Sequence, residues 1–162
     1  FIAINHEAKT KFWVFYVTYI LAFSIEAVGV TFGWPFGDYT YGPVLGWKLF
    51  ETPLIIGVNW IVLLYGANSI ANYVGLTAIT RALCAAALMV FIDYLIEPVA
   101  IQLDFWSWER GTPPLENYLG WFAASFLISL LWQLAKVQLN QLIGAAMYVI
   151  QLLFFAALIL LL

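Results

Sequence analysis

Long apolar runs dominate this chain, and they restrict it to a bundle of helices that cross a membrane. About twenty consecutive apolar residues span the hydrocarbon core of a bilayer as a helix. Runs long enough to do so cover residues 12–30, 53–74, 76–103, 119–139 and 142–162. Only 9% of the residues are charged, against about 25% in soluble domains, so the chain cannot cover a water-facing surface. We predict an all-α, polytopic transmembrane bundle with at least five spanning helices in a single integral membrane domain.

Two connections between these runs are rich in aromatic residues, glycine and proline. Residues 31–52 read TFGWPFGDYTYGPVLGWKLFET, and residues 104–118 read DFWSWERGTPPLENY. Both are too broken to span as helices, and the alternation of the spans places both loops on one side of the membrane. The links near 72–75 and 140–141 are very short. They predict that the second and third helices, and the fourth and fifth, are antiparallel neighbours.

The basic residues indicate an orientation. With a cytoplasmic N-terminus, four of them lie on or near the cytoplasmic side and two lie opposite, namely Lys9, Lys11, Arg81 and Lys136 against Lys48 and Arg110. Cytoplasmic loops carry an excess of Lys and Arg, so we predict this orientation in a prokaryotic cytoplasmic membrane. The chain does not begin with Met, and we expect one or both ends to be incomplete, which makes five spans a minimum.

Three carboxylates lie inside the apolar runs: Glu26, Asp93 and Glu97. An acid at the centre of a spanning helix costs about 2.5–3.5 kcal/mol to insert and commonly marks a functional site. Asp93 and Glu97 are four residues apart, which puts both on one helix face. Two close carboxyls in a low-dielectric interior do not both ionise cheaply, so one is expected to keep its proton. The alternative is that these acids only hold neighbouring helices together.

The same topology brings further residues to the depth of the acids. Glu26, Asn59 and the Asp93–Glu97 pair each lie near the end of their helix that faces the two loops. Most of the aromatic residues are expected to pack in the bundle or at its interfaces, but those of the loops can form a lid over the acids. Aromatic faces stabilise a nearby cation by about 0.5–2 kcal/mol. A greasy pocket with a proton donor therefore suits carbocation chemistry on a hydrocarbon.

Several kinds of site are excluded by what the sequence lacks. His6 is the single histidine, so a multi-histidine di-iron site cannot be built and haem ligation is disfavoured. The sequence has no DDxxD pair for a magnesium diphosphate, no Gly-rich nucleotide loop and no basic cluster for nucleic acid. We predict no metal, no cofactor and no nucleic-acid partner. Acid–base chemistry without a cofactor and pure binding both remain open.

An ordered set of motifs covers most of the chain: Glu26 with the Gly-rich stretch after it, FGDYTYG at 36–42, LG at 45–46, TPLIIGVNW at 52–60, DYLIEPVA at 93–100, FWSW at 105–108 and PLENYLGWF at 114–122. This set resembles the membrane-embedded carotenoid biosynthesis proteins, a family that includes the bacterioruberin-type and gamma-carotene-type carotenoid hydratases. The chain departs from such hydratases at Asp104, where a small residue is expected, and in being short.

The resemblance implies a cofactor-independent hydro-lyase that adds water across the terminal double bond of an acyclic carotenoid, giving a tertiary alcohol. It implies Asp93 and Glu97 as the acid–base pair, with Glu26 relaying protons or positioning water. The residues implied to bind substrate or water are polar or aromatic and lie near the loops, namely Phe36, Tyr39, Tyr41, Asn59, Trp60, Trp106, Trp108 and Asn117. The implied partners are a carotenoid or other polyisoprenoid and the lipid bilayer.

Two other functions fit the residues. A non-catalytic membrane subunit could hold a carotenoid or lipid within a larger complex, and the nearly uncharged fourth and fifth helices are compatible with contacts to such partners. A small proton-coupled transporter would also use buried acids. It would be expected to show paired broken helices in two halves, which this sequence lacks.

Overall fold

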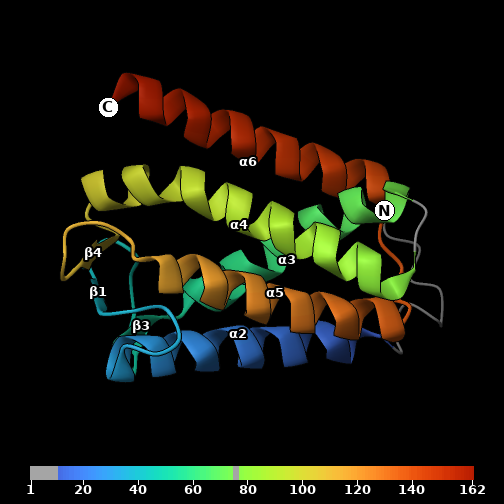
Figure 1. Cartoon of the computed structure of the whole chain (residues 1–162), viewed down its shortest axis with the longest axis horizontal. Coiled ribbons are helices and arrows are strands. Elements are labelled where there is room, and N and C mark those ends of the chain that lie inside the picture. The colour runs from blue at the N-terminus through green and yellow to red at the C-terminus, as the bar shows by residue number, and fades with distance from the viewer. Residues whose placement is uncertain (1–10, 75–76) are drawn as a thin grey trace.

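Five helices lie along one another in the part of the chain that the structure, a computed structural model, describes: residues 11–74 and 77–162 (Figure 1). They are α2 (Phe12–Phe32), α3 (Ile55–Ala71), α4 (Ala78–Gln102), α5 (Leu115–Leu134) and α6 (Gln141–Leu161). The short 3-10 helix η1 (Asn72–Val74) continues α3. Lys9 and the predicted start of the third helix at residue 76 lie outside the described residues.

The prediction of five spanning helices is wrong. Within the described residues, four helices are long and apolar enough to cross a membrane: α2, α3 with η1, α4 and α6. They indicate an integral membrane protein. Helix α5 is not among them, because it begins at Leu115 and ends at Leu134, so it includes Glu116 and Asn117 and omits the last five residues of the predicted span. The predicted cytoplasmic N-terminus stays a prediction.

The order of the helices in space differs from the predicted one in part. Helices α3 and α4 pack against each other, as their short link predicted. Helix α5 packs mainly against α4, but α6 packs on α3 and α4 rather than on α5. The reason is that α5 ends at Leu134 and α6 begins at Gln141. The connection is therefore long enough to carry the chain across to the other side of α4, as Figure 1 shows.

Small and polar side chains hold the interior of the bundle together. The amide of Asn68 on α3 donates to Ser129 Oγ on α5 at 2.9 Å, and Gln133 donates to Asn68 Oδ1 at 3.2 Å. The indole of Trp132 donates to Thr18 Oγ1 on α2 at 2.7 Å. Such bonds are typical of helices in lipid, where apolar contact alone gives no preference for another helix over the bilayer. They connect α2, α3 and α5 at the end of the bundle away from the loops.

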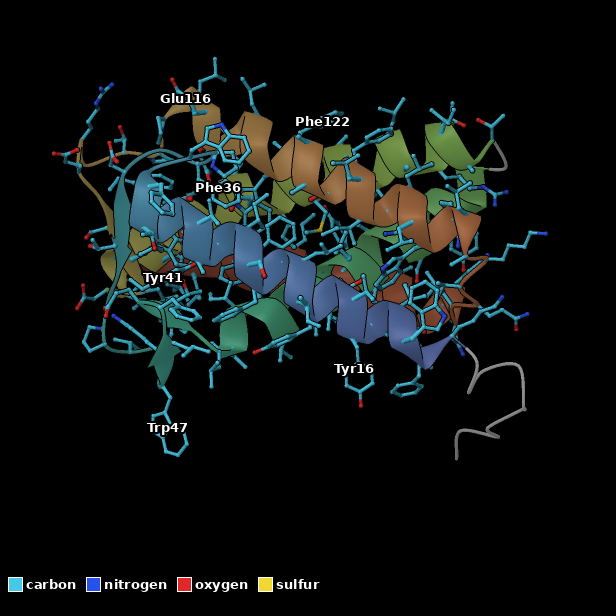
Figure 2. The ribbon with its side chains drawn as sticks, turned by 90° about the horizontal axis from the view of Figure 1, so that it is seen from below. Tyr16, Phe36, Tyr41, Trp47, Glu116 and Phe122 are labelled. Carbon is cyan, nitrogen blue, oxygen red and sulfur yellow. The ribbon has the colours of Figure 1, made fainter. Side chains whose placement is uncertain are left out.

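Short strands in both aromatic loops make the chain mostly helical rather than all-α. Strand β1 (Tyr39–Tyr41) pairs antiparallel with β4 (Trp106–Trp108), so both loops lie at the same end of the bundle (Figure 1). Strands β2 (Lys48–Leu49) and β3 (Thr52–Pro53) form a hairpin beside this ribbon. Trp47, just before β2, projects away from the helices (Figure 2).

Replacing Asn68 with leucine is expected to lower the free energy of unfolding by about 1–2 kcal/mol, because Ser129 and Gln133 lose a buried partner. Unfolding in mixed micelles measures this difference. The matched substitution Asn72→Leu removes a single bond from Gln133 at the end of the helix and should cost less. Equal losses in the two variants would contradict a role for Asn68 as the central link.

Candidate functional site

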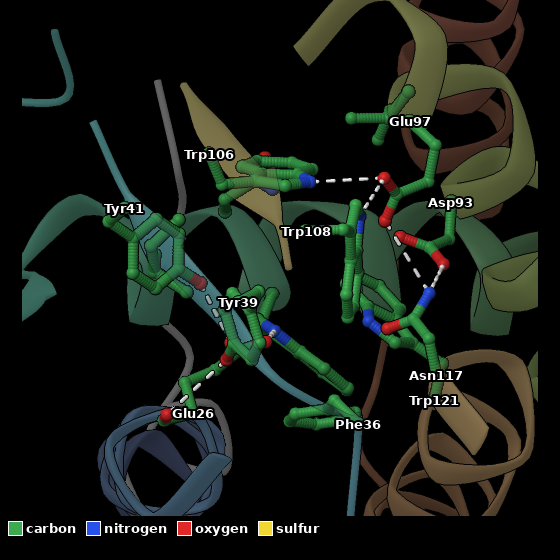
Figure 3. A pocket seen from close by; sticks show the side chains of 14 residues that line it. Glu26, Phe36, Tyr39, Tyr41, Asp93, Glu97, Trp106, Trp108, Asn117 and Trp121 are labelled. Carbon is green, nitrogen blue, oxygen red and sulfur yellow. Dashed lines mark hydrogen bonds between the residues drawn. The ribbon is translucent and has the colours of Figure 1, made fainter. Parts of the chain in front are cut away.

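The residues predicted to form the site converge at the loop end of the bundle. One cavity under the β1–β4 ribbon is lined by side chains from α2, α3, α4, α5 and both strands of the ribbon (Figure 3). Those predicted from the sequence are Glu26, Phe36, Tyr39, Tyr41, Asn59, Trp60, Asp93, Glu97, Trp106, Trp108 and Asn117. The structure thus brings every predicted site residue together, while their catalytic and binding roles stay predictions.

Glu26, near the end of α2, is held by three neutral donors. Its Oε1 accepts from the indole of Trp60 on α3 at 2.9 Å. Its Oε2 accepts from the hydroxyls of Tyr39 at 2.6 Å and Tyr41 at 2.7 Å, both on β1. The side chain is buried, so both of its oxygens are satisfied within the protein and it links α2, α3 and the ribbon.

Glu97 is held from the other strand of the ribbon. Its Oε2 accepts from the indoles of Trp106 at 3.1 Å and Trp108 at 2.8 Å. Its Oε1 accepts a long bond of 3.5 Å from the amide nitrogen of Asn117, in the first turn of α5. The same nitrogen donates to Asp93 Oδ2 at 2.9 Å. One amide group therefore connects the two carboxyls that lie a helical turn apart on α4.

Asp93 differs from the two glutamates in having a free oxygen. Its Oδ1 is buried and has no hydrogen-bond partner among the described residues, although the carboxyl lines the cavity. Most buried polar atoms are paired, because an unpaired one loses its hydration without compensation. Among the described residues, Oδ1 of Asp93 is the one carboxyl oxygen of the three acids to which no group donates.

The alternation of side chains along the ribbon explains how the donors reach the acids. Tyr39 lies opposite Trp108, and Tyr41 lies opposite Trp106. Alternate residues of a strand point to the same face, so these four rings face the bundle. Thr40 and Ser107, which lie between them on the two strands, face outward. The ring centroids of Tyr39 and Trp108 are 5.0 Å apart. The ribbon thus forms an aromatic roof whose polar atoms donate to Glu26 and Glu97.

The cavity is narrow. Its volume is about 30 Å³, which is room for one or two water molecules rather than for the end of a hydrocarbon chain. Stacked indoles form one of its walls: the rings of Trp60 and Trp121 are 4.3 Å apart between centroids and inclined by 23°. A hydrocarbon can enter only if a wall residue moves. Once inside, it would meet aromatic faces together with carboxyl groups.

Three further residues line the cavity and were not predicted from the sequence: Ile56, Ile96 and Trp121. The sequence does contain a signal for two of them. Trp121 follows Asn117 by four positions and Ile56 precedes Trp60 by four, which places each pair on one helix face. Counting one helical turn from Asn117 and from Trp60 would therefore have predicted Trp121 and Ile56 as lining residues.

No group of three or more acidic, histidine or cysteine side chains in the described residues is arranged to hold a metal ion.

The surroundings of Tyr39 and Tyr41 in the roof shift the pKa of both side chains. Burial raises the pKa of Tyr39 and of Tyr41 well above its ordinary value near 10, and the nearby Glu26 raises each pKa further. Both hydroxyls therefore stay protonated at neutral pH and remain donors to Glu26.

A consequence for stability can be tested. The folded protein binds these two protons more tightly than the unfolded chain does, so the free energy of unfolding should fall as the pH rises above about 10. An absorbance titration of tyrosinate should show a delayed phase that coincides with unfolding. The Tyr39→Phe/Tyr41→Phe variant should lose part of that phase. Substituting the exposed Tyr16 and Tyr73 by phenylalanine should leave the delayed phase unchanged, and the opposite pattern would contradict the assignment.

The comparison with protein families covers nearly the whole chain. Residues 2–162 match the family described as carotenoid biosynthesis protein. The chain belongs to this family, as the ordered motifs predicted.

One characterised relative is similar in sequence. The bisanhydrobacterioruberin hydratase of Haloarcula japonica is 31% identical over 126 residues, which are 70% of this chain and 41% of that protein. The aligned segment thus spans less than half the length of this relative. No solved structure matches the chain.

Proposed function

We propose that this protein is a cofactor-independent hydro-lyase that adds water to the terminal double bond of an acyclic carotenoid. The observation that carries the proposal is the free, buried oxygen of Asp93 next to Glu97 in a cavity of water size. The family and the similarity to a bacterioruberin hydratase support the class of substrate and reaction. Two adjacent carboxyls in a buried aromatic cavity supply the acid and the base that hydration of an alkene requires.

The proposed reaction begins with protonation of the alkene. Asp93 donates its proton to the less substituted carbon, the π electrons form the new C–H bond, and positive charge develops on the tertiary carbon. Water then attacks that carbon through its oxygen and forms the C–O bond. Glu97 takes the excess proton of the added water. The proton returns from Glu97 to Asp93 across the pair that Asn117 connects, which restores the starting state.

The assignment of the acid and the base follows from the hydrogen bonds. Glu97 accepts from three donor groups and Glu26 from three, an arrangement that favours the ionised form. Asp93 accepts from one, so it is the carboxyl proposed to hold the proton. Glu26 is proposed to add negative charge that stabilises the cation, and its tyrosine partners to relay protons. Asn59, half-buried at the cavity, is proposed to orient the water.

The substitutions Asp93→Asn and Glu97→Gln are each expected to lower the rate of hydration by about 10²–10⁴, because each removes one partner of acid–base catalysis. The chain is expressed in cells that accumulate lycopene, an acyclic carotene, and extracted pigments are separated to quantify the hydroxylated product. Asp104→Asn and Glu116→Gln are matched controls, because these acids are exposed and lie outside the cavity. Both controls should retain the wild-type rate.

Other outcomes distinguish the competing functions. Pigment that co-purifies with the wild-type chain but is never hydroxylated would overturn the hydratase proposal in favour of a binding subunit. Full activity in both acid variants would show that the pair does not carry the chemistry. A carotenoid-independent proton flux in reconstituted vesicles would support the transporter instead.

A further inference from the structure

An apolar groove runs along the outside of the bundle between α2 and α5. Its walls come from Leu21, Ser24 and Val28 on α2 and from Ala124 and Leu127 on α5, and Trp34 closes the end near the loops. From Leu21 to Val28 the groove follows α2 for about 10 Å. Its volume is about 290 Å³, against about 30 Å³ for the acidic cavity. The groove has room for a hydrocarbon chain, whereas the cavity does not.

The groove and the acidic cavity are adjacent. Ile25 lines the groove and the next residue, Glu26, lines the cavity. Ala124 lines the groove one turn beyond Trp121 and Gly120 on α5. Helices α2 and α5 thus contribute to both spaces, although α3, α4 and the ribbon also line the cavity, and the groove lies on the outer side of these two helices.

A single ring stands between the two helices at this point. Phe36 is buried and lines the cavity. A Cβ placed on Gly29 of α2 would lie 2.7 Å from its ring, and a Cβ placed on Gly120 of α5 would lie 2.8 Å from it. Both helices therefore lack a side chain at the place where the ring sits. Figure 3 shows Phe36 on the same side of the cavity as Glu26, with the Asp93–Glu97 pair beyond.

We infer that the groove between α2 and α5 holds the polyene chain of an acyclic isoprenoid that enters sideways from the bilayer, with Phe36 as the gate to the acids. This inference rests on the proposed function and adds the path that its substrate takes. A long hydrocarbon dissolves in lipid rather than in water, so lateral entry spares it a passage through the aqueous phase. Movement of the Phe36 ring would join the groove to the cavity and admit the terminal double bond.

The chemistry of the lining supports this occupant. The groove is almost entirely apolar, with Ser24 as its one hydroxyl side chain. It presents no charged group that would recognise a lipid headgroup or a soluble metabolite. It also leads to a proton donor rather than to bulk solvent. A polyene end is the class of ligand that both the groove and the cavity accept.

The test fills the groove without touching the cavity. Ser24 and Leu127 are exposed groove residues, so Ser24→Phe and Leu127→Trp add bulk there with little disturbance of the core. Ala123→Phe is the matched control, because Ala123 is also exposed on α5 but does not line the groove. Each full-length variant is purified from cells that accumulate lycopene, and both the bound lycopene and the hydroxylated product are quantified.

Each groove variant is expected to lower bound lycopene and product by about tenfold, because overpacking of the groove excludes the chain, while Ala123→Phe keeps both at the wild-type level. Asp93→Asn should keep its lycopene and lose the product. Unchanged lycopene in both folded groove variants, or a wild-type chain that retains no lycopene, would overturn the inference. If Asp93→Asn still forms product while the groove variants lose lycopene, the proposal of acid–base catalysis is wrong, but binding of the polyene chain in the groove is supported.

Discussion

The structure depends on keeping three carboxylates buried in a helical bundle, where the described part of the chain pairs none of them with a cation. An ionised carboxylate moved from water into a low-dielectric interior loses several kcal/mol of hydration free energy unless hydrogen bonds replace the water. Here the replacements are neutral: two phenols, three indoles and one amide. These donors satisfy both oxygens of Glu26 and of Glu97, whereas Asp93 Oδ1 receives none. Neutral donors do not cancel the charge of an acid that ionises, so such an acid favours positive charge near it.

The positions of the acids could be predicted because they follow from residue spacing along each helix and from the alternating direction of the helices. Helical spacing puts Asp93 and Glu97 on one face, and the alternation of the helices brings them to the same end as Glu26. The donors on β1 and β4 could not be paired with these acids in this way, because they depend on a ribbon that pairs Thr40 with Ser107, 67 positions away. The alternation of aromatic and small residues in YTY and WSW is a strand signal, but the glycines and prolines around it favoured a loop.

The wrong prediction that residues 119–139 form a spanning helix, where the structure has α5, has a related cause. Hydropathy is summed over a whole helix and does not record which face a polar residue occupies. Helix α5 turns Asn117, Ser125 and Ser129 into the bundle, where they contact other helices or line the cavity. With Glu116, these residues make α5 less apolar than the four candidate spans. The prediction judged the run 119–139 by its many apolar residues and gave these polar positions too little weight.

The pairing of β1 with β4 has a consequence for how the cavity opens. The phenols that bind Glu26 belong to one strand, and the indoles that bind Glu97 belong to the other. The strands are bonded to each other, so neither set can withdraw alone. A displacement of the ribbon would remove both sets of donors in one event, while Trp60 on α3 and Asn117 on α5 could still donate to Glu26 and Glu97. The two glutamates, on different helices, are thus mechanically coupled through the ribbon, and a movement that weakens the hold on one also weakens the hold on the other.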